Sequence, residues 1–388
     1  MIAGAGPVGL VAAANLVGHG VPVTVLEANA GLSEESRAST FHPPTLDMLD
    51  RLGVAEPLIA QGLIAPQFQY RSKRDGLIAQ FDFKAIADAT AHPFRLQCEQ
   101  SRLTRILLDR LRHSDNFEIV FSSPVCGATQ TADGIEVTVM RDGRMETETA
   151  RWLIGADGAR SETRSALGVE FEGFTWPERF LVVSTPFDFH GVIKDLVSVN
   201  YVADPQRWHF LLQIPGIWRI MFPIAAGESD ALALSSDFAQ SLMTQLVPGI
   251  DRYEIVHVTL YRVHQRVAKT FRQGRAFLIG DAAHINNPLG GMGMNGGVHD
   301  AINLTERLAE VWHGSKGDAE LDRFDRQRRL VTKEYVEKQS IQNKKNLETP
   351  GTEFLDRLAE IAADARKTRE YLLAVSMISS LERARELG

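Results

Sequence analysis

Apolar and polar positions at the start of the chain follow the order strand, helix, strand. A short apolar run at residues 1–3 precedes the glycine-rich "GAGPVG", and apolar side chains then recur at helical spacing over residues 8–17. Gly18 and Gly20 end that helix, and "VPVTVL" predicts a second strand that ends at Glu27. This order is typical of a βαβ unit in a parallel sheet.

The order of strand, glycine-rich loop and helix returns twice. Residues 276–279 are apolar and predict a buried strand, "GDAAHINNPLGGMGMNGG" follows it, and helical spacing of apolar residues continues from Val298. In the middle of the chain the apolar residues 152–154 precede "GADG", and Ser161 can cap a helix over residues 162–167. Taken alone, "GADG" is equally compatible with a simple hairpin turn.

Residues 170–261 follow a different pattern. Short runs alternate apolar and polar side chains, as in "LVSVNYVADPQRWHFLLQIPGIWRIMFPIA", and Asp-Pro and Pro-Gly pairs separate them. This alternation predicts antiparallel strands. Residues 66–96 predict two or three further strands that join the same sheet, and the tail from residue 346 has the spacing of helices.

The first glycine-rich loop has the G-x-G-x-x-G spacing of a dinucleotide site. Gly4 permits a tight turn, Gly6 lets the backbone approach a pyrophosphate, and Gly9 lets helix and strand pack closely. The helix N-terminus then presents free N–H groups and a partial positive charge to the phosphates. Glu27 is placed to bind a ribose hydroxyl, which fits FAD or NAD and would repel the 2′-phosphate of NADP.

Composition narrows the class of protein. A chain of 388 residues is long enough for two cores, and its 44% apolar and 23% charged residues are typical of a soluble globular protein. We find no apolar stretch near the ~20 residues that span a bilayer, and no signal-peptide pattern at the start. The net charge of −7 argues against a nucleic-acid partner. Two cysteines without C-x-x-C spacing indicate a reducing compartment, the cytoplasm, and no metal site.

The chain resembles the FAD-dependent aromatic hydroxylases, the single-component flavoprotein monooxygenases typified by para-hydroxybenzoate and phenol hydroxylases. The resemblance rests on three segments in this order, "GAGPVG", "GADG" and "GDAAH", and extends to "SRASTFHPPTLDMLDRLGV", "QCEQSRLTRILLDRL" and "YRVHQRVAKTFRQGRAFLIGDAAH". It covers most of the chain except residues 171–260 and the tail after about residue 345.

This resemblance implies an α/β fold with a Rossmann-type FAD-binding domain, a mixed or antiparallel β-sheet substrate domain and C-terminal helices. The FAD-binding domain would occupy residues 1–170 and 262–345, with residues 66–96 lending strands to the substrate-binding sheet at 171–261. The helical tail, 346–388, is expected to pack on the FAD-binding domain or on another subunit. Members of the family often dimerise, which leaves a homodimer open for this chain.

The resemblance also implies roles for single residues. Glu27 is similar to the ligand of the adenosine ribose, Arg37 to the arginine beside the pyrophosphate, and Gln100 to a glutamine that contacts the cofactor. Asp281 resembles the aspartate of the ribityl or pyrophosphate region, and Asp157 the acid of a loop that serves both FAD and the nicotinamide cofactor. The full set of expected cofactor residues is Gly4, Gly6, Pro7, Gly9, Glu27, Arg37, Gln100, Asp157, Asp281, Gly293, Met294 and Asn295.

The loop after Asp281 carries the expected flavin face. Pro288 looks like the proline of the loop at which oxygen reacts. Met294 and Asn295 are expected to begin a helix whose backbone N–H groups face the flavin O2 and stabilise the reduced, anionic ring. We interpret His284 as a structural hydrogen-bonding residue in preference to a catalytic base.

Five residues of the predicted sheet are candidates for contact with the substrate. Tyr201 and His209 are candidate catalytic residues that could relay a proton from a phenol, and Gln213, Trp218 and Arg219 are candidate substrate ligands. In the hydroxybenzoate branch of the family, an arginine on these strands anchors the substrate carboxylate. Arg219 does not stand at the matching position of this sequence but near it, so benzoate specificity is in doubt. For Tyr201, His209, Gln213 and Trp218 taken singly, we favour the role of an ordinary sheet residue over contact with a substrate. Strand register decides which face a side chain joins.

The reaction implied by the resemblance uses NADPH or NADH as a transient electron donor. Hydride would pass to FAD, O2 would form a C4a-hydroperoxyflavin, and a phenolic or related aromatic substrate would be hydroxylated. Alternatives are a related FAD oxidoreductase or epoxidase that acts on a non-aromatic or polycyclic natural product, and a flavin-binding protein without turnover. The flavin-dependent halogenases share the N-terminal fold, but "IWRIMFPI" does not match their W-x-W-x-I-P motif.

Overall fold

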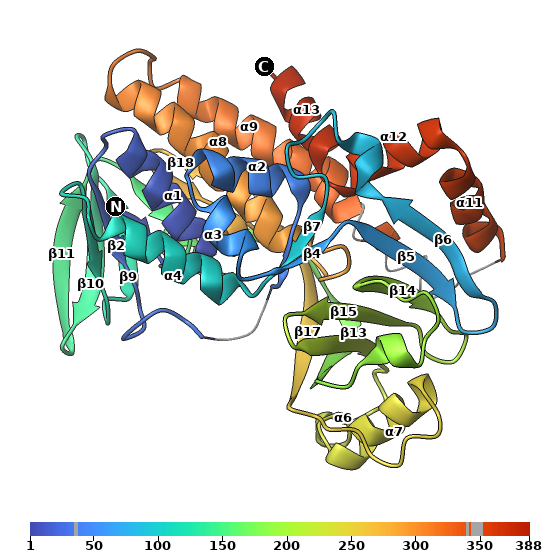
Figure 1. Cartoon of the computed structure of the whole chain (residues 1–388). Coiled ribbons are helices and arrows are strands. Elements are labelled where there is room, and N and C mark those ends of the chain that lie inside the picture. Colours follow the sequence, from blue (N-terminus) through green and yellow to red (C-terminus); the bar gives the residue numbers. More distant parts are fainter. Residues whose placement is uncertain (35–37, 339–340, 343–351) are drawn as a thin grey trace.

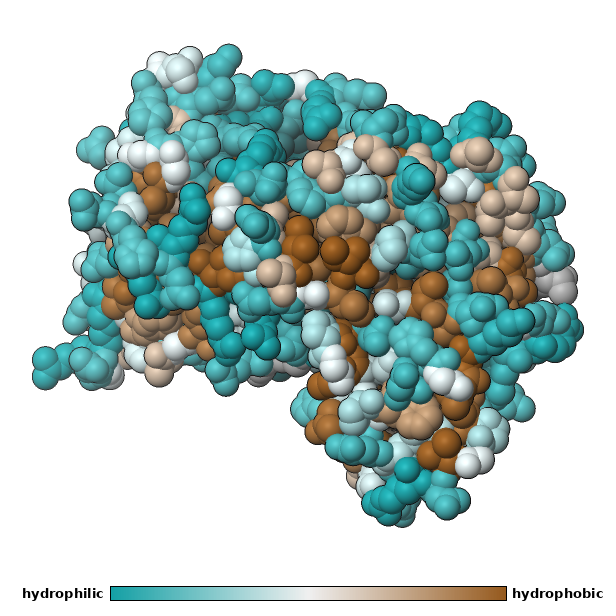
Figure 2. Space-filling view, viewed as in Figure 1, coloured by the Kyte–Doolittle hydropathy of each residue, from teal (hydrophilic) through white to brown (hydrophobic). Residues whose placement is uncertain are grey.

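The protein has two lobes (Figure 1). The computed structural model describes residues 1–34, 38–338, 341–342 and 352–388. One lobe holds the chain start and the long helices, and the other holds the largest sheet. Hydrophobic residues gather near the middle of the displayed face, where the lobes join (Figure 2). Within the described ranges we find no helix long and apolar enough to cross a membrane.

A six-stranded sheet forms the centre of the first lobe. The strands lie in the order β18 (Arg272–Gln273), β19 (Ala276–Leu278), β12 (Leu153–Gly155), β1 (Ile2–Ala3), β2 (Val23–Leu26) and β8 (Phe117–Val120). All neighbours are parallel except β18 and β19. The central strands β1, β12 and β19 are buried along their whole length, which explains their unbroken apolar sequences.

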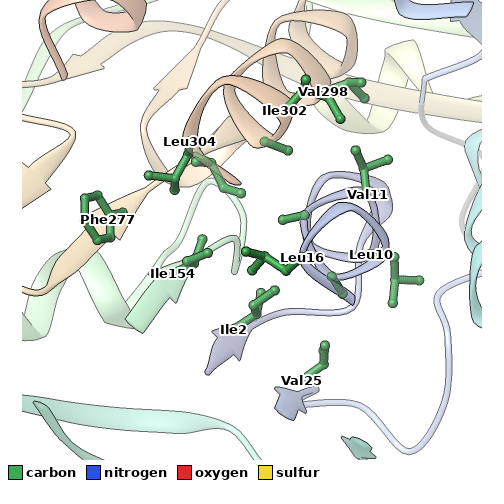
Figure 3. Packing of buried hydrophobic residues seen from close by; sticks show 14 of the residues in the cluster. Ile2, Leu10, Val11, Leu16, Val25, Ile154, Phe277, Val298, Ile302 and Leu304 are labelled. Carbon is green, nitrogen blue, oxygen red and sulfur yellow. The ribbon is translucent and has the colours of Figure 1, made fainter. Parts of the chain in front are cut away.

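Helices and a small antiparallel sheet cover this parallel sheet. The helices of the lobe are α1 (Pro7–Gly18), α2 (Pro43–Arg51), α3 (Ala55–Ile59), α4 (Gln100–Leu111), α5 (Glu162–Ala166), α8 (Met292–Trp312) and α9 (Glu320–Val331). The small sheet consists of β9 (Val125–Gln130), β10 (Ile135–Arg141) and β11 (Arg144–Ala150). Apolar side chains of α1, α8 and the parallel strands meet in one core, as Figure 3 shows for Leu10, Val298 and Ile154.

An eight-stranded sheet forms the second lobe. Its order is β20 (His284–Ile285), β17 (His257–Ala268), β13 (Phe171–Thr185), β16 (Ile217–Ile224), β15 (His209–Ile214), β14 (Val199–Ala203), β5 (Gln67–Ser72) and β6 (Gly76–Asp82). Only β14 and β5 pair in parallel. Helices α6 (Asp230–Ala233) and α7 (Ser236–Leu246) cover one face of this sheet. The fold is therefore the predicted α/β class with a mixed sheet, and the expected boundary at 261–262 falls inside β17.

A short three-stranded sheet connects the lobes. It contains β3 (Thr40–Phe41), β7 (Arg95–Gln97) and β4 (Leu63–Ala65), with β7 in the middle. Among the described residues, the 3-10 turns are η1 (Phe83–Ile86), η2 (Phe189–Gly191) and η3 (Gly280–Ala282), and the π-helical turn η4 (Thr332–Glu337) follows α9. Because β7 continues the chain after β5 and β6, it brings the edge of the substrate sheet against the first lobe.

The C-terminal tail is helical, as expected, and it packs on the substrate sheet as well as on the FAD-binding lobe. Helices α11 (Thr352–Ala363) and α12 (Ala365–Val375) lie against β6 and η1, and α13 (Ile378–Glu386) lies against α9 (Figure 1). The ring of Tyr371 lies 4.6 Å from that of Phe81, and Arg369 forms an ion pair with Asp88. The tail therefore joins the core of the substrate sheet, a contact that sequence reasoning missed.

Candidate active site

The first glycine-rich loop is packed as its spacing predicts. Gly4 has a φ of +102°, and a Cβ there would lie 2.6 Å from the carbonyl oxygen of Ala156. A Cβ on Gly9 would lie 2.1 Å from the carbonyl oxygen of Gly4. A Cβ on Gly6, in contrast, would meet no atom within 4 Å. Gly4 and Gly9 are therefore required by the fold, while Gly6 leaves an opening in front of α1.

Glu27 closes this loop from the side. Its buried carboxylate accepts hydrogen bonds from the backbone N–H of Ala5 at 2.7 Å and of Asn29 at 2.9 Å. The Asn29 amide also donates to it, at 2.7 Å. Oε1 accepts both Asn29 bonds, whereas Oε2 accepts only the Ala5 N–H and keeps a second lone pair that can accept a ribose hydroxyl. Glu27 thus shapes the turn and lies next to the expected adenosine site.

The middle loop organises its own helix. Asp157 accepts hydrogen bonds from the Ser161 hydroxyl and, at 2.9 Å, from the Thr163 backbone N–H. Ser161 caps α5 by accepting from the N–H of Arg164, which confirms the predicted cap. The Arg164 guanidinium donates to the carbonyl of Ala282 at 2.9 Å and so ties this loop to the third glycine-rich segment.

The third segment turns sharply before α8. Gly290 and Gly291 have φ values of +95° and +65°, and Pro288 accepts the N–H of Gly291 at 3.0 Å. Helix α8 begins at Met292, two residues before the predicted start at Met294, and no side chain caps it. Its first N–H groups therefore have no intrahelical partner and can bind a polar or anionic group.

Side chains from other elements hold this turn in place. The Asn295 amide accepts from the N–H of His42 at 2.9 Å and donates to the carbonyls of Thr40 and Gly291 at 2.9 and 2.6 Å. His42 Nε2 donates to the Gly290 carbonyl at 2.7 Å. Burial, followed by the charge of Arg95, holds the pKa of His42 well below its usual value, so the ring is neutral. Asn295 thus positions the turn through its side chain.

A buried ionic network supports the same segment. Asp300 accepts from His284 Nε2 and from Arg328 Nε, both at 2.7 Å, and from the Gly280 N–H at 3.1 Å. Burial by itself would raise the pKa of Asp300, but the charges of His284 and Arg328 outweigh it and hold that pKa below its usual value. His284 is therefore engaged inside the core, which agrees with the structural role expected for it.

The geometry fits a bound FAD. Helices α1 and α8 both begin without a side-chain cap, and they pack against each other, with a Cβ on Gly297 reaching within 2.6 Å of Val8 Cγ2. Their N-terminal N–H groups and the opening at Gly6 suit the phosphates and polar ring edge of a dinucleotide. Pro7 is the first residue of α1, where its missing N–H leaves nothing unsatisfied.

The remaining expected cofactor residues lie around this opening or outside the described part of the chain. Gln100 is the first residue of α4 and is half-buried, and Asp281 is exposed in η3, just after β19. Gly293 and Met294 belong to the first turn of α8, and Pro288 is exposed. Arg37 falls outside the residues that the structure describes. Direct contact of these side chains with FAD remains a prediction.

A small cavity lies beside the turn before α8, and we call it the tyrosine cavity. Its volume is about 10 Å³, and its lining comprises Phe68, Tyr70, Arg95, Tyr201, Gly290, Met292, Tyr371 and Val375. The rings of Tyr70 and Tyr201 stack with centroids 5.0 Å apart. The hydroxyl groups of Tyr70 and Tyr371 lie 3.1 Å apart, within hydrogen-bond distance. Aromatic side chains thus meet the glycine-rich turn at this point.

Both members of this hydroxyl pair stay protonated. Burial raises the pKa of Tyr70 well above its usual value, and burial also raises the pKa of Tyr371 to about 12. Arg95, also in the lining, is 3% exposed, and its guanidinium lies 4.7 Å from the ring centre of Phe68. Its Nη1 is 3.5 Å from the Tyr201 hydroxyl. The cavity therefore combines neutral hydroxyls with one buried cation.

Of the five predicted substrate-sheet residues, only Tyr201 lines this cavity. His209, Gln213 and Trp218 belong to the face covered by α6 and α7, because Tyr201 pairs with Phe210 and neighbours along a strand point to opposite faces. His209 Nδ1 donates to the Arg207 carbonyl oxygen at 3.2 Å, and burial lowers the pKa of His209 to about 4. These three side chains point to the face of the sheet opposite the cavity, so they cannot contact a substrate there.

Arg219 lies on the cavity side of the sheet but is engaged elsewhere. Its guanidinium forms an ion pair of 2.8 Å with Glu99, the residue before α4. Burial lowers the pKa of Arg219, and the Glu99 charge opposes that effect. This pair joins the substrate sheet to the first lobe, so Arg219 is better placed to hold the two lobes together than to bind a substrate.

Sequence reasoning missed most of the cavity lining. The missed residues are Phe68, Tyr70, Arg95, Tyr371 and Val375. They come from β5, β7 and α12, which are far apart along the chain. A weak sign was present in the aromatic residues of "PQFQYRS" and "FDFKAI", which are dense for a hairpin, but no pattern connected them with the tail.

A second, larger groove lies away from this chemistry. It has a volume of about 380 Å³ and is bordered by Met1, Val23 and Trp152 at the start of the parallel strands, with Trp312 across from them. Ligands of such sheets bind at the carboxyl ends of the strands, which is the end that carries Gly4 and Gly155. The tyrosine cavity is therefore the better candidate for the active site, although it is the smaller space.

Comparison with known proteins agrees with this geometry. The family model described as "FAD binding domain" matches residues 1–339. The chain is 36% identical over 343 residues to a para-nitrophenol 4-monooxygenase of Pseudomonas sp. (strain WBC-3), covering 87% of this chain and 84% of that one. It is 34% identical over 382 residues to the 6-hydroxy-3-succinoylpyridine 3-monooxygenase HspB of Pseudomonas putida, covering 96% of each.

A solved structure is similar over nearly its whole length. The crystal structure of p-nitrophenol 4-monooxygenase PnpA from Pseudomonas putida DLL-E4 matches with a TM-score of 0.91 and 31% identity, covering 99% of this chain and 97% of that one. The expected FAD cofactor, enzyme class and fold are thereby confirmed. The chain belongs to the family of FAD-dependent aromatic monooxygenases.

Proposed function

We propose that this enzyme uses NADPH or NADH and O2 to hydroxylate a single-ring phenolic substrate in the tyrosine cavity. The observation that carries the proposal is the lining of that cavity, in which aromatic side chains of the substrate sheet meet Gly290 and Met292 of the turn before α8. A ring bound there lies between Tyr201 and the helix N-terminus that suits the flavin. The volume of about 10 Å³ is room for about one water molecule, so a ring enters only when side chains of the lining move apart.

Bound FAD supplies electron transfer from the nicotinamide cofactor and the activation of oxygen. The opening at Gly6 and the uncapped ends of α1 and α8 would hold it, with Glu27 at the ribose. The protein's own contribution is to exclude water and to orient the ring. The buried lining excludes water, since Tyr201 is 4% and Arg95 is 3% exposed.

Tyr201 is the residue placed to assist deprotonation of the phenol. Its hydroxyl is near the cavity and near the Arg95 guanidinium, at 3.5 Å. A hydroxyl beside a cation can donate a hydrogen bond to the substrate oxygen and so favour its ionised form, which is the more electron-rich ring. Of the two candidate relays, Tyr201 and His209, we therefore propose Tyr201, because His209 lies on the other face of the sheet.

The names of the two similar enzymes guide the choice of substrates. The first name contains a nitrophenol, and the second contains a hydroxypyridine with a succinoyl group. Both compounds are single rings that carry a hydroxyl and a polar substituent. We infer the same substrate class for this chain.

The cysteines Cys98 and Cys126 are free, which supports a reducing, cytoplasmic location. A homodimer stays a prediction that light scattering after size-exclusion chromatography tests.

Anaerobic bleaching of the bound flavin tests this proposal. NADPH and NADH are each added to the holoenzyme with and without nitrophenols, hydroxypyridines, hydroxybenzoates and polycyclic phenols. We expect a single-ring phenol to accelerate bleaching by about 10-fold or more, and polycyclic phenols to have no effect. Failure of both nucleotides to bleach the flavin under every condition would contradict the use of NAD(P)H.

A further inference from the structure

Arg95 differs from the other buried arginines of the described residues. Arg71, Arg164 and Arg328 each donate a hydrogen bond of 2.9 Å or less to an oxygen. Arg95 has a single contact of this type, at 3.5 Å, to the Tyr201 hydroxyl, and its Nε has no hydrogen-bond partner. Its other neighbours are two rings, those of Phe68 and Phe83.

The charge of Arg95 is not neutralised by an acidic side chain. No ion pair joins Arg95 to an Asp or Glu in the part of the chain that the structure describes. A guanidinium keeps its charge at every physiological pH, so a buried one needs hydrogen bonds or a counter-charge. The ring contacts offset part of the loss of water. The N–H groups of Arg95 thus retain capacity for an anionic oxygen.

The cavity offers this cation to a ligand. Arg95 borders the cavity together with Tyr70, Tyr201 and Tyr371, and the lining contains no Asp or Glu. Tyr70 and Tyr371 bond to each other through their hydroxyls and remain neutral there. Arg95 is therefore the only ionised group of the lining, and an aromatic anion would place its ring against the tyrosines and its charge at Arg95.

We propose that Arg95 binds an anionic oxygen of the aromatic substrate, a phenolate or a carboxylate, and so selects charged rings over neutral rings of equal size. This inference rests on the proposed function, because it assigns the substrate class of the same cavity. Arg95 comes from β7, outside the substrate-sheet strands that carried the candidate arginine in the sequence. Its side chain reaches the cavity because β7 lies between the two lobes.

Substrate binding to the holoenzyme tests the assignment by the change in flavin absorbance. The probes are two pairs of similar size, 4-nitrophenolate with 4-nitroanisole and 4-hydroxybenzoate with 4-hydroxybenzamide. The variants are Arg95→Gln and Arg95→Lys. Arg71→Gln is the matched control, because Arg71 is also buried but lies on β5 next to Tyr70 and faces away from the cavity.

We expect Arg95→Gln to weaken binding of one or both anions by about 10- to 100-fold, the loss of a charge-assisted hydrogen bond, with little change for the neutral partners. The two anions distinguish a phenolate site from a carboxylate site. Arg95→Lys should recover part of the affinity, and Arg71→Gln should preserve the preference for anions. Retained flavin content shows that each variant is folded.

Two results would overturn the assignment, and they differ. If the wild type turns over a phenol but Arg95→Gln weakens charged and neutral rings equally, Arg95 is a packing residue and the proposed function stands. If the wild type binds none of the four rings and no phenol accelerates bleaching, the proposed function fails and the assignment fails with it.

Discussion

The two halves of the site are built in different ways. The first glycine-rich loop of the dinucleotide site brings together residues that are close in sequence, since the Cβ position of Gly9 lies against the carbonyl of Gly4. The tyrosine cavity joins residues as distant as Tyr70 and Tyr371, which are 301 positions apart. The first depends on local backbone geometry and the second on how two lobes and a tail pack. A motif can therefore reveal the cofactor while the substrate site stays hidden.

The two regions also treat buried charge differently. In the first lobe, Asp300 has both His284 and Arg328 as partners, and the network serves the fold. In the cavity, Arg95 has aromatic neighbours and one long contact to a hydroxyl. A charge that is paired within the protein stabilises structure, and a charge that retains hydrogen-bonding capacity beside a cavity is available to a ligand.

Glycine substitutions should give the largest effects and separate fold from cofactor binding. Gly9→Ala forces a Cβ against the Gly4 carbonyl, so we expect loss of folded protein or destabilisation by at least about 3 kcal/mol. Gly6→Ala meets no protein atom within 4 Å, so the apoprotein should unfold at the same temperature as wild type. Its FAD affinity should nevertheless fall by about 10-fold or more, because the methyl group occupies the path of the pyrophosphate.

Thermal unfolding of apoprotein and titration with FAD measure these effects. Gly18→Ala, near the end of α1 and also open around its Cβ position, is the matched control and should change neither quantity. Equal destabilisation of the apoprotein by Gly6→Ala and Gly9→Ala would show that the opening at Gly6 is not free space.

Asp300→Asn should have the next largest effect. It removes one charge from a buried network and leaves Arg328 without its carboxylate, so the free energy of unfolding at pH 7 should fall by about 3–5 kcal/mol. The pKa of Asp300 is lowered in the fold, so its stabilisation is present above the unfolded pKa, about 4, and is lost as pH falls further. The difference between variant and wild type should therefore shrink below about pH 4.

Urea unfolding between pH 7 and pH 3 checks this behaviour. Asp109→Asn changes an exposed carboxylate that pairs with Arg112 on α4, and it should cost less than about 1 kcal/mol. A pH-independent difference for Asp300→Asn would mean that lost packing, and not ionisation, causes the destabilisation.

Tyr201→Phe and His209→Gln should give the smallest effects and compare the two faces of the sheet. Tyr201→Phe keeps the ring stacked on Tyr70 but removes the hydroxyl, so we expect product formed per NAD(P)H oxidised to fall by about 10-fold. His209→Gln should leave that ratio unchanged, because His209 faces α6 and α7. Product and nicotinamide assays in parallel give the ratio, and a drop for His209→Gln alone would reverse the assignment of faces.

The sequence by itself determined the elements whose causes are local. The βαβ start, the Ser161 cap and the glycine-rich turns follow from side chains a few positions apart, because capping and positive φ act over one turn of chain. The start of α8 was misplaced by two residues, since an uncapped helix that begins among glycines has little apolar pattern in its first turn.

Only the tertiary structure decided the substrate side. Whether Tyr201 or His209 faces the cavity depends on strand register, and a shift of one residue would exchange the faces. The pairing of Tyr70 with Tyr371 depends on where the tail docks, and the position of Arg95 depends on β7 crossing between the lobes. These contacts arise from long-range packing. Hydrophobic periodicity predicts which face of an element is buried, but it does not predict which other element covers that face.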